Sequence, residues 1–263
     1  MKIMLTVLLP VLNEEKYLDK CLGSLFSQTY RNFKIICIND GSTDGTGLII
    51  AKWKKKYSSR MQVVTHEDNV GFTDSLNEGL GLISTKWTAR IDADDCWHPE
   101  KLEKQLAYLA SNTKTKLIGC NYINVSDNFE RQVNLPETDT QIRKYFVRDN
   151  PFGHSCVVFD TDLVRSIGGY NKEYYPSDDY ELWFRLSENG SLYNLKETLC
   201  RRRLGDGISI LSQNRQLNNC MRIQSKIIRS QKLPIYNYVY TVPTLLTLIT
   251  PGWVRGLKRK FFN

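Results

Sequence analysis

The sequence predicts an α/β fold with a doubly wound, mostly parallel, Rossmann-like sheet, and three observations support this prediction. Over the first 125 of the 263 residues, short apolar runs alternate with longer segments that carry apolar residues on one helical face. Hydrophobic residues make up 41% of the chain, which is enough to bury a sizeable core and excludes wholesale disorder. Acidic and polar residues follow several predicted strands, where open α/β sheets bind their ligands.

The predicted strands and helices alternate regularly over the first 110 residues. We expect strands at Met4–Leu9 and Phe33–Ile38, which are mainly apolar, and at Met61–Thr65 and Trp87–Ile91. Each helix has one apolar face, and we expect helices at Glu14–Gln28, from Thr43 or Asp44 through Trp53, at Thr73–Ile83 and at Pro99–Ala110. Asn13 is the expected N-cap of the first helix, and Thr43 or Asp44 that of the second.

The second half of the chain is less regular. Residues 126–150 are polar and are predicted to form a loop, and Cys156–Phe159 is predicted as a strand. Asp178 and Asp179 then precede an aromatic-rich helix. Two interpretations stay open: an aspartate caps this helix, or the pair beside Trp183 contains a catalytic base with a shifted pKa.

The cysteine and histidine counts argue against several kinds of site. The seven cysteines are widely spread and form no CxxC pair, which is typical of a reducing cytosol and not of a disulfide framework or a cysteine zinc site. The three histidines are too few for multi-histidine metal chemistry. The first residues resemble a strand, so we expect no secretory signal. Carboxylates are therefore the expected reactive groups.

The net charge of +8 is unevenly distributed along the chain. From residue 201 onward there are twelve Lys and Arg and one acidic residue, Asp206, giving +11, whereas residues 1–200 carry 24 basic and 27 acidic residues, giving −3. A basic tail of this kind suits phospholipid headgroups, a phosphorylated substrate or nucleic acid. The alternative is a solvated helix face.

Three predicted strands end in acidic or polar residues. These ends are Pro10–Glu14, Asp40-Gly41-Ser42 and Asp92-Ala93-Asp94-Asp95. Neither GxGxxG nor GxxxxGK[ST] is present, so no glycine-rich loop is expected to hold a phosphate. Because carboxylates repel a diphosphate unless a divalent cation lies between them, the acidic strand end predicts Mn²⁺ or Mg²⁺ bound by oxygen ligands.

Taken together, these segments resemble the family 2 glycosyltransferases, which have the GT-A fold. The resemblance covers residues 4 to about 210 and depends on the order and spacing of its motifs. The motifs are Pro10-Val11-Leu12-Asn13-Glu14, Asn39-Asp40-Gly41-Ser42-Thr43-Asp44-Gly45-Thr46, Asn69-Val70-Gly71 with Asn77, Arg90-Ile91-Asp92-Ala93-Asp94-Asp95 with Pro99, Gly168-Gly169-Tyr170, and Asp178-Asp179-Tyr180-Glu181-Leu182-Trp183. The resemblance implies metal-dependent transfer of a hexose, with inversion, from a nucleotide-sugar (usually a UDP-sugar) to an acceptor hydroxyl.

The resemblance implies donor-side roles for the matching residues. Asp40 is expected to hydrogen-bond the nucleotide base. Asp92 and Asp94 are expected to form the DxD motif, with Asp94 binding the metal and Asp92 lying nearer the ribose and phosphates. Asp95 is expected to support this site or to contact the donor sugar. The other expected donor-binding residues are Pro10, Val11, Asn13, Glu14, Asn69, Gly71 and Arg90.

On the acceptor side, the resemblance implies that Asp179 is the general base. Asp178, at a position where glutamate is commoner, and Trp183 are expected to support it. The chain departs from the family where a tyrosine-arginine-x-histidine run is common, because the region reads Cys200-Arg201-Arg202-Arg203-Leu204-Gly205-Asp206. An arginine is the alternative contact for the diphosphate, and the sequence does not select among the three.

The tail suggests a partner. Ile235–Val254 is uncharged and rich in aromatic residues but is interrupted by prolines, which favours a segment at a membrane interface over a span; the alternative is a helix packed on the body. We therefore expect a GT-A domain over 1–210, in which 1–125 bind the nucleotide-sugar and 126–210 hold the acceptor and base. Residues 211–263 are expected to form a basic amphipathic extension.

The resulting functional hypothesis is a cytoplasmic enzyme, peripheral on the inner face of the cell membrane. It adds a sugar to a glycan acceptor, with polyprenyl diphosphate as the expected lipid carrier, in O-antigen, capsule or exopolysaccharide assembly. The alternatives are a nucleotidyltransferase, which leaves Asp178 and Asp179 without a role, and a non-catalytic, membrane-associated sugar-nucleotide-binding protein, which needs no base. No nucleic-acid partner is expected, because the tail lacks a recognisable motif.

Overall fold

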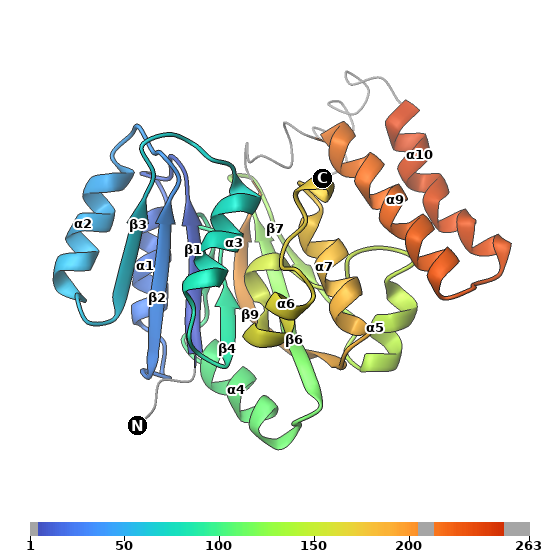
Figure 1. The fold of residues 1–263 in the computed structure, drawn as a ribbon, viewed down its shortest axis with the longest axis horizontal. Helices are drawn as coiled ribbons and strands as arrows, with labels where there is room; N and C mark the ends of the chain where they lie inside the picture. Colours follow the sequence, from blue (N-terminus) through green and yellow to red (C-terminus); the bar gives the residue numbers. More distant parts are fainter. Residues whose placement is uncertain (1–4, 205–212, 250–263) are drawn as a thin grey trace.

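The computed structural model describes residues 5–204 and 213–249 and confirms the α/β class (Figure 1). Within these ranges, nine strands form a single sheet in the order β3-β2-β1-β4-β8-β6-β9-β5, with β7 beside β6. The strands are β1 (Leu5–Val11), β2 (Phe33–Asn39), β3 (Met61–Thr65), β4 (Trp87–Arg90), β5 (Cys96–Trp97), β6 (Thr115–Val125), β7 (Glu130–Val133), β8 (Val158–Asp160) and β9 (Ser191–Arg203).

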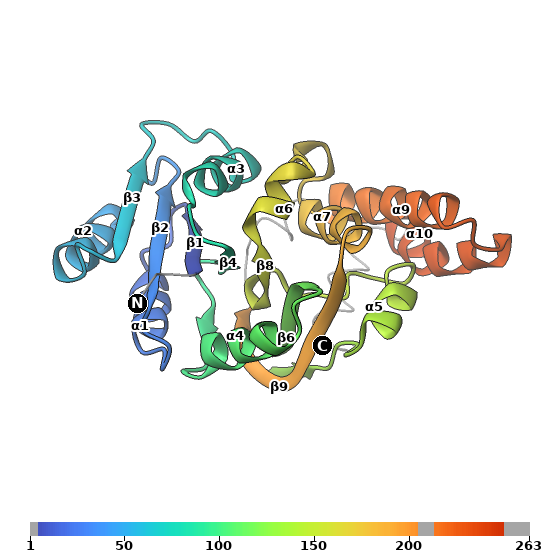
Figure 2. The same cartoon turned by 60° about the horizontal axis from the view of Figure 1, so that its bottom comes forward.

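Helices cover both faces of this sheet. The α-helices are α1 (Leu18–Phe26), α2 (Thr46–Lys56), α3 (Phe72–Leu82), α4 (Lys101–Ser111), α5 (Asp139–Tyr145), α6 (Thr161–Ser166), α7 (Asp178–Ser187), α9 (Gln213–Ser230) and α10 (Val242–Ile249). Short 3₁₀ helices are η1 (His154–Cys156), η2 (Lys172–Tyr174) and η3 (Ile235–Thr241). Figure 2 shows α3, α6 and α7 on one side of the sheet and α1 and α4 on the other.

The direction of the strands determines where the cleft lies. β3, β2, β1 and β4 are parallel, because a helix returns the chain after β1, β2 and β3. β8 runs antiparallel to both β4 and β6, and β9 runs parallel to β6. The carboxyl ends of β1, β2 and β4 therefore meet at one edge of the sheet, where open α/β sheets bind ligands.

The core lies on both faces of the central strand β1, whose seven residues are all buried. Leu5, Val7 and Leu9 pack with α1, whereas Leu8 packs on the opposite face with α3. This alternation follows the two-residue repeat of a strand, and burial on both faces is typical of a parallel strand between two helical layers.

Two expectations about helix starts are wrong. The first helix begins at Leu18 and not at Glu14, and Asn13 is not its N-cap. Asn13 has a positive φ of 53° and its side-chain oxygen accepts the Thr43 N–H at 2.8 Å, so it ties together the turns after β1 and β2. The second helix begins at Thr46 after Gly45, although Asp44 still accepts the Thr46 N–H at 3.0 Å.

Two expectations about the second half also need correction. The predicted loop 126–150 contains strand β7 and helix α5, which begins with a capping box between Thr138 and Gln141. This polar helix is only seven residues long, so apolar periodicity gave no signal for it. The segment Cys156–Phe159, predicted as one strand, instead begins with the last residue of η1. The strand β8, which pairs with β4 and β6, starts only at residue 158.

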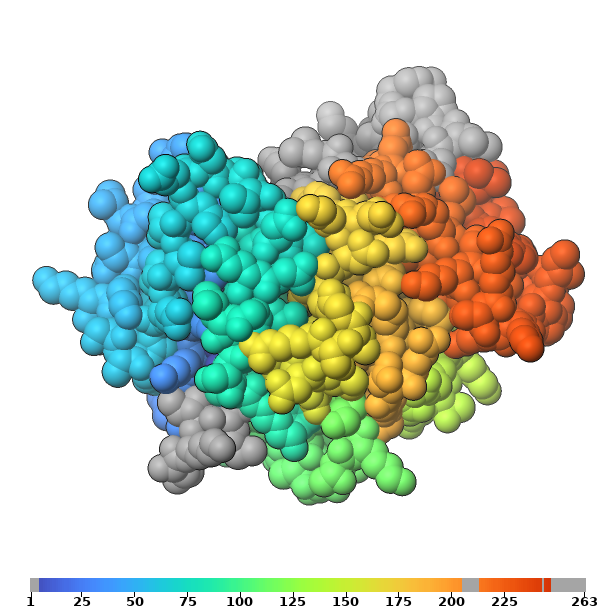
Figure 3. Space-filling model, viewed as in Figure 1, coloured from blue at the N-terminus to red at the C-terminus, as the bar shows by residue number. Residues whose placement is uncertain are grey.

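The C-terminal helices form one end of the molecule, opposite α2 (Figure 3). Ile223 and Ile227 of α9 are buried in the same core as α7, and η3 and α10 then pack against α9. None of the described helices combines the length and apolar character needed to cross a bilayer. The predicted interfacial segment extends beyond residue 249, and that part of it lies outside the described residues.

Candidate active site

A cleft of about 1230 Å³ opens at the carboxyl edge of the sheet. Its lining combines the ends of β1, β2 and β4, the start of α3, the start of α7 and the last residues of β9. Of the predicted donor-binding residues, those lining this cleft are Pro10, Val11, Asn13, Glu14, Asp40, Asn69, Gly71, Asp92, Asp94 and Asp95. Asp178 and Asp179 line it as well, so one cavity contains both predicted halves of the site.

Asp40 forms the wall of the cleft at the end of β2. Its carboxylate accepts the N–H groups of Val70 at 2.9 Å and Gly71 at 3.1 Å, and it lies 2.8 Å from the ring of His66. Although burial opposes its ionisation, these hydrogen bonds hold the pKa of Asp40 below its ordinary value. Asp40 is therefore an ionised acceptor that fixes the loop before α3.

Asp92 is held in place by Arg90 and Ser155. Its carboxylate forms an ion pair with Arg90 and accepts the Ser155 hydroxyl at 2.9 Å, while Ser155 Oγ accepts the Asp92 N–H at 2.9 Å. Burial opposes ionisation, but the Arg90 guanidinium holds the pKa of Asp92 well below its usual range. Arg90 is fully buried and lies outside the cleft lining, so it reaches the donor site only through Asp92.

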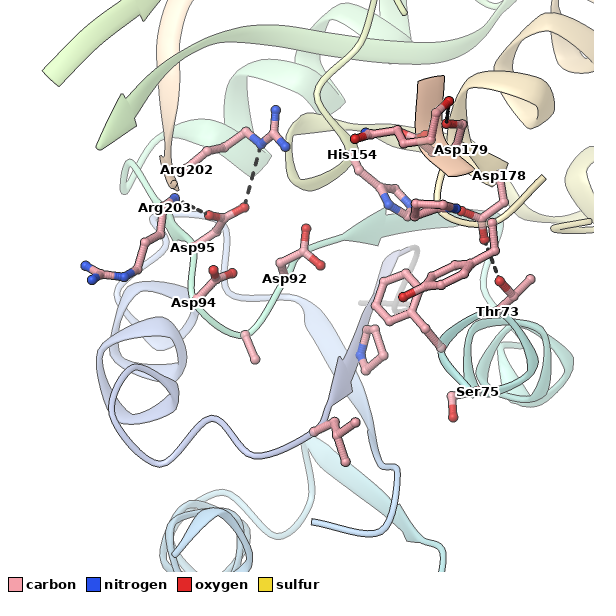
Figure 4. A pocket seen from close by; sticks show the side chains of 18 of the residues that line it. Thr73, Ser75, Asp92, Asp94, Asp95, His154, Asp178, Asp179, Arg202 and Arg203 are labelled. Carbon is pink, nitrogen blue, oxygen red and sulfur yellow. Dashed lines mark hydrogen bonds and ion pairs between the residues drawn. The ribbon is translucent and has the colours of Figure 1, made fainter. Parts of the chain in front are cut away.

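Three further carboxylates crowd the same edge without comparable compensation, and Figure 4 shows two of them, Asp94 and Asp95, near Asp92. Burial, then the charge of Asp92, raises the pKa of Asp94. Burial, with the charges of Asp92 and Asp94, also raises the pKa of Asp95. The pKa of Glu14 is raised to about 7 by burial and by Asp94 and Asp92. This group of oxygens therefore carries more negative charge than its surroundings stabilise.

The donor set fits a divalent cation. All candidate ligands are carboxylate oxygens, which Mg²⁺ and Mn²⁺ prefer, and a cation would relieve the repulsion that raises their pKa values. Among the described residues, no three His, Cys, Asp or Glu side chains form a ready metal cage. Mg²⁺ commonly binds through one or two carboxylates together with substrate phosphates. Asp92 and Asp95 have arginine partners, whereas Asp94 and Glu14 have no basic partner in an ion pair among the described residues and are the carboxylates left to bind a cation.

The end of β9 places two arginines in the cleft. Arg202 lies over the ring of Tyr122 at 4.8 Å and 3.9 Å from Asp95, and its Nε is buried without a hydrogen-bond partner. The backbone N–H of Arg203 donates to Asp95 at 2.7 Å. Arg201 instead pairs with Glu130 outside the cleft. The structure thus selects Arg202 and Arg203 from the three candidate arginines.

Asp179 faces the acidic edge from the start of α7, with His154 between them in Figure 4. Burial, then the charge of Asp178, raises the pKa of Asp179 to about 7. Asn150 donates to its Oδ2 at 2.9 Å. The N-cap of α7 is Ser177, whose side chain forms no capping bond, and Oδ1 of Asp179 accepts the N–H of Tyr180 in the first turn at 2.7 Å. Asp179 is therefore a carboxyl group in the cleft lining with a pKa near neutrality.

Asp178 has a different environment from its neighbour. It is buried and accepts the Thr73 hydroxyl at 2.7 Å, which connects α7 to the start of α3. Trp183 does not line the cleft. It is fully buried beneath it, with ring centroids 6.0 Å from His154 and 5.6 Å from Phe159. Asp178 therefore links two elements of the cleft wall, and Trp183 belongs to the core beneath it.

Sequence analysis missed Ser155, Asn150, Thr73 and His154. Ser155 contacts Asp92 across 63 residues and Asn150 contacts Asp179 across 29. His154 is buried and bonded to the Tyr170 hydroxyl at 3.0 Å, and burial and the nearby Arg90 lower its pKa well below the ordinary value. The only sequence signal was the position of Asn150-Pro151-Phe152-Gly153-His154-Ser155 just before a predicted strand.

Comparisons with known proteins identify the family. Residues 6–168 match the family described as Glycosyl transferase family 2. The amylovoran biosynthesis glycosyltransferase AmsE of Erwinia amylovora is 34% identical over 207 residues, covering 77% of each chain.

Two solved structures share the fold. S. aureus TarS 1–349 in complex with UDP-GlcNAc aligns with a TM-score of 0.72 at 20% identity, covering 93% of this chain and 72% of the other. The mannosyltransferase PcManGT of Pyrobaculum calidifontis, in complex with GDP-Man and Mn²⁺, aligns with a TM-score of 0.69 at 17% identity, covering 94% and 70%. The predicted GT-A fold is confirmed.

Proposed function

Because the chain belongs to glycosyl transferase family 2, we propose that its cleft transfers a hexose, with inversion, from a nucleotide-sugar to a hydroxyl of a glycan acceptor. One observation supports this proposal: a single cavity is lined by Asp179, a carboxyl group with a pKa of about 7, and by an edge crowded with acidic residues. Direct displacement at the anomeric carbon needs one base and no enzyme nucleophile, which is the logic of inverting glycosyl transfer.

On the donor side, we assign the nucleoside to the turn Pro10–Glu14 and to the wall formed by Asp40, Asn69 and Gly71. UDP is the favoured nucleotide, since TarS with the same fold is described in complex with UDP-GlcNAc. Asp92, held by Arg90 and Ser155, would lie beside the ribose and phosphates. In this arrangement residues 1–125 supply the donor site and residues 126–210 supply most of the acceptor site.

Around the diphosphate, Asp94 would hold Mn²⁺ or Mg²⁺, with Asp92 beside it. The bound cation supplies positive charge to the departing nucleoside diphosphate. PcManGT, described with GDP-Man and Mn²⁺, supports this assignment. Arg202 and Arg203 add fixed positive charge next to the acidic edge, in place of the family histidine. Asp95 receives the N–H of Arg203 and therefore anchors the end of β9.

On the acceptor side, Asp179 would take the proton of the attacking hydroxyl. Its pKa of about 7 suits this step, because a base works best when its pKa lies near the working pH. Asn150 donates to Oδ2 of Asp179 and the Tyr180 N–H donates to Oδ1, so the carboxylate that would accept the proton is held at both oxygens.

A screen of UDP-, GDP- and dTDP-sugars tests the proposal. We expect one nucleotide class to be hydrolysed slowly in the presence of Mn²⁺, measured as released nucleoside diphosphate, and Asp179→Asn to abolish sugar transfer once an acceptor is supplied. If none of the sugars releases its nucleotide and none of the nucleotides binds, the proposal is wrong.

We also propose that the acceptor is carried by a lipid and that the protein works at an anionic membrane surface. The segment η3–α10 exposes large apolar side chains: Ile235 is 84% exposed, Tyr236 72% and Val239 58%. Residues 213–249 contain five basic and no acidic residues. Exposed apolar and aromatic groups next to basic residues are typical of interfacial segments. A polyprenyl-diphosphate-linked glycan, as in surface polysaccharide assembly on the cytoplasmic face, fits this surface.

A further inference from the structure

His66 lies between the carboxylates of Asp40 and Glu78, and the proposed transfer reaction gives it no role. Its Nδ1 is 2.8 Å from Oδ1 of Asp40, and its Nε2 is 2.6 Å from Oε2 of Glu78. The three residues come from different elements: Asp40 follows β2, His66 follows β3 and Glu78 lies on α3. Among the described residues, Asp40 and Glu78 are the charged groups that face this ring.

Asp40 connects His66 to the backbone that forms the wall of the cleft. Its carboxylate accepts the N–H groups of Val70 and Gly71, and Gly71 lines the cleft just before α3. The loop is tightly seated, because a Cβ on Gly41, whose φ is +74°, would lie 2.6 Å from the backbone carbon of Asp68. A change in the orientation of Asp40 would therefore move the backbone that borders the donor.

We propose that His66 is a positioning residue of the donor site, and that its doubly protonated ring holds Asp40, and with it the loop 68–71, in the geometry that binds the nucleotide. This inference rests on the proposed function, because it assigns the loop to the nucleotide. It adds a residue outside the cleft lining that controls donor affinity.

Hydrogen-bond chemistry explains why protonation matters. An imidazolium ring donates from both nitrogens, whereas a neutral ring donates from one and accepts at the other. Ionised carboxylates only accept, so deprotonation of His66 leaves one ring nitrogen facing a carboxylate without a proton between them. The hydrogen bonds from His66 to Asp40, followed by those to Glu78, outweigh burial and raise the pKa of His66 above its ordinary value of 6.5.

The pH dependence expected for His66 is opposite to that expected for Asp179. Because the pKa of His66 is raised, the geometry that binds the nucleotide is complete at low pH and is lost as pH rises through that pKa. Asp179 becomes a competent base as pH rises through about 7. Nucleotide affinity is therefore expected to fall over the range in which turnover rises.

Calorimetric titration of UDP, with GDP and dTDP in parallel, tests this proposal without measuring turnover. Mg²⁺ is held constant and pH is varied from 6 to 9. We expect His66→Gln, whose side chain has one donor nitrogen in place of two and no charge, to weaken binding about tenfold at pH 6, the effect of losing one charged hydrogen bond. We also expect this variant to lose most of the decline in affinity with pH. His98→Gln, at an exposed histidine outside the cleft, is the matched control.

Glu78→Gln separates positioning from simple stability. Glu78 is also outside the cleft lining, and removing its charge should lower the pKa of His66. We expect the decline in nucleotide affinity to move to lower pH in this variant, with wild-type affinity at pH 6. The ionisation of the nucleotide itself is the same in every titration, so differences in affinity between the wild type and the variants come from the protein.

Three results would overturn the inference. It is wrong if His66→Gln follows the wild-type affinity at every pH, or if it lowers only the melting temperature. It is also wrong if Glu78→Gln leaves the pH dependence unchanged. If the wild-type chain binds none of the three nucleotides, this inference and the proposed function both fail. If the nucleotides bind but substitution of His66 leaves their affinity unchanged, only this inference fails.

Discussion

Asp178 and Asp179 are adjacent in sequence but differ in what their carboxylates can do. Both line the cleft, but Asp178 is buried and accepts the Thr73 hydroxyl, whereas the pKa of Asp179 is raised to about 7. The raised pKa means that the fold favours the protonated form of Asp179. Ionised Asp179 therefore opposes folding, increasingly as pH rises from about 4 to about 7, and a neutral side chain at this position relieves that cost.

We expect Asp179→Asn to reduce kcat about 10²–10⁴-fold, because a general base is lost. In the wild type, the rate at saturating donor should rise with pH up to about 7 and then level off, and this dependence should disappear in the variant. Steady-state kinetics over pH 5.5–9 and melting temperatures at pH 8 provide the measurements.

Asp178→Asn is the matched control for this prediction, since asparagine can still accept the Thr73 hydroxyl. We expect a smaller kinetic loss for it than for Asp179→Asn. If Asp178→Asn abolishes transfer while Asp179→Asn does not, the base is the other carboxylate. A lower melting temperature for Asp179→Asn with only mild kinetic loss would show that the residue is structural.

At the scale of elements, the segment η3–α10 is the clearest unexplained surface. Ile235 is 84% exposed and Leu245 47%, so charged substitutions there disturb little packing. We expect the full chain to co-sediment with vesicles that contain anionic lipid and less so at high salt, because screening weakens the electrostatic part. The double variant Ile235→Glu/Leu245→Glu should lose most of this binding.

Leu48→Glu is the control for the membrane prediction. Leu48 is 79% exposed, but it lies on α2 at the opposite end of the molecule. We expect this variant to co-sediment like the wild type. Equal binding of wild type and double variant would exclude the segment as the membrane contact, and a change from dimer to monomer in the double variant would assign the surface to a second copy of the chain.

The elements that were predictable from sequence are those with strong local patterns. The strands β1 and β2 are dominated by apolar residues, β3 and β4 are short segments of mixed apolar and polar residues, and the acidic turn after β4 is a local motif. Helix α5 was missed because its seven residues include a single apolar core residue, Ile142, and so carry no apolar repeat; its capping box is the only signal. Ser155 and Asn150 were missed because their roles depend on contacts made only in the fold, with Asp92 and Asp179.

For the whole molecule, donor binding should stabilise the fold, because the cleft is built from both halves of the chain. A ligand at 100 times its Kd stabilises the folded state by about 2.7 kcal/mol. For a chain of this size, that corresponds to an increase in Tm of roughly 5–10 °C. We expect UDP with Mn²⁺ to give this increase and UDP alone to give less, as measured by thermal unfolding.

Asp94→Asn should remove the contribution of Mn²⁺ to this stabilisation while leaving the Tm without ligands close to that of the wild type. Asp162→Asn, at a residue that is largely exposed and outside the cleft, is the control. If Mn²⁺ adds the same increment to Asp94→Asn as to the wild type, Asp94 does not bind the metal.

The bond between the Arg203 N–H and Asp95 has a consequence for synthesis of the chain on the ribosome. It joins positions 108 residues apart, and β9 is the strand that pairs along β6. At about 5–20 residues per second, the nascent chain carries the acidic edge for roughly 5–20 s before β9 is made. Once β6 has been made within that interval, its edge stays unpaired until β9 follows, and a neighbouring chain can add a strand there. The order of synthesis therefore makes this enzyme most vulnerable to aggregation just before its active site is complete.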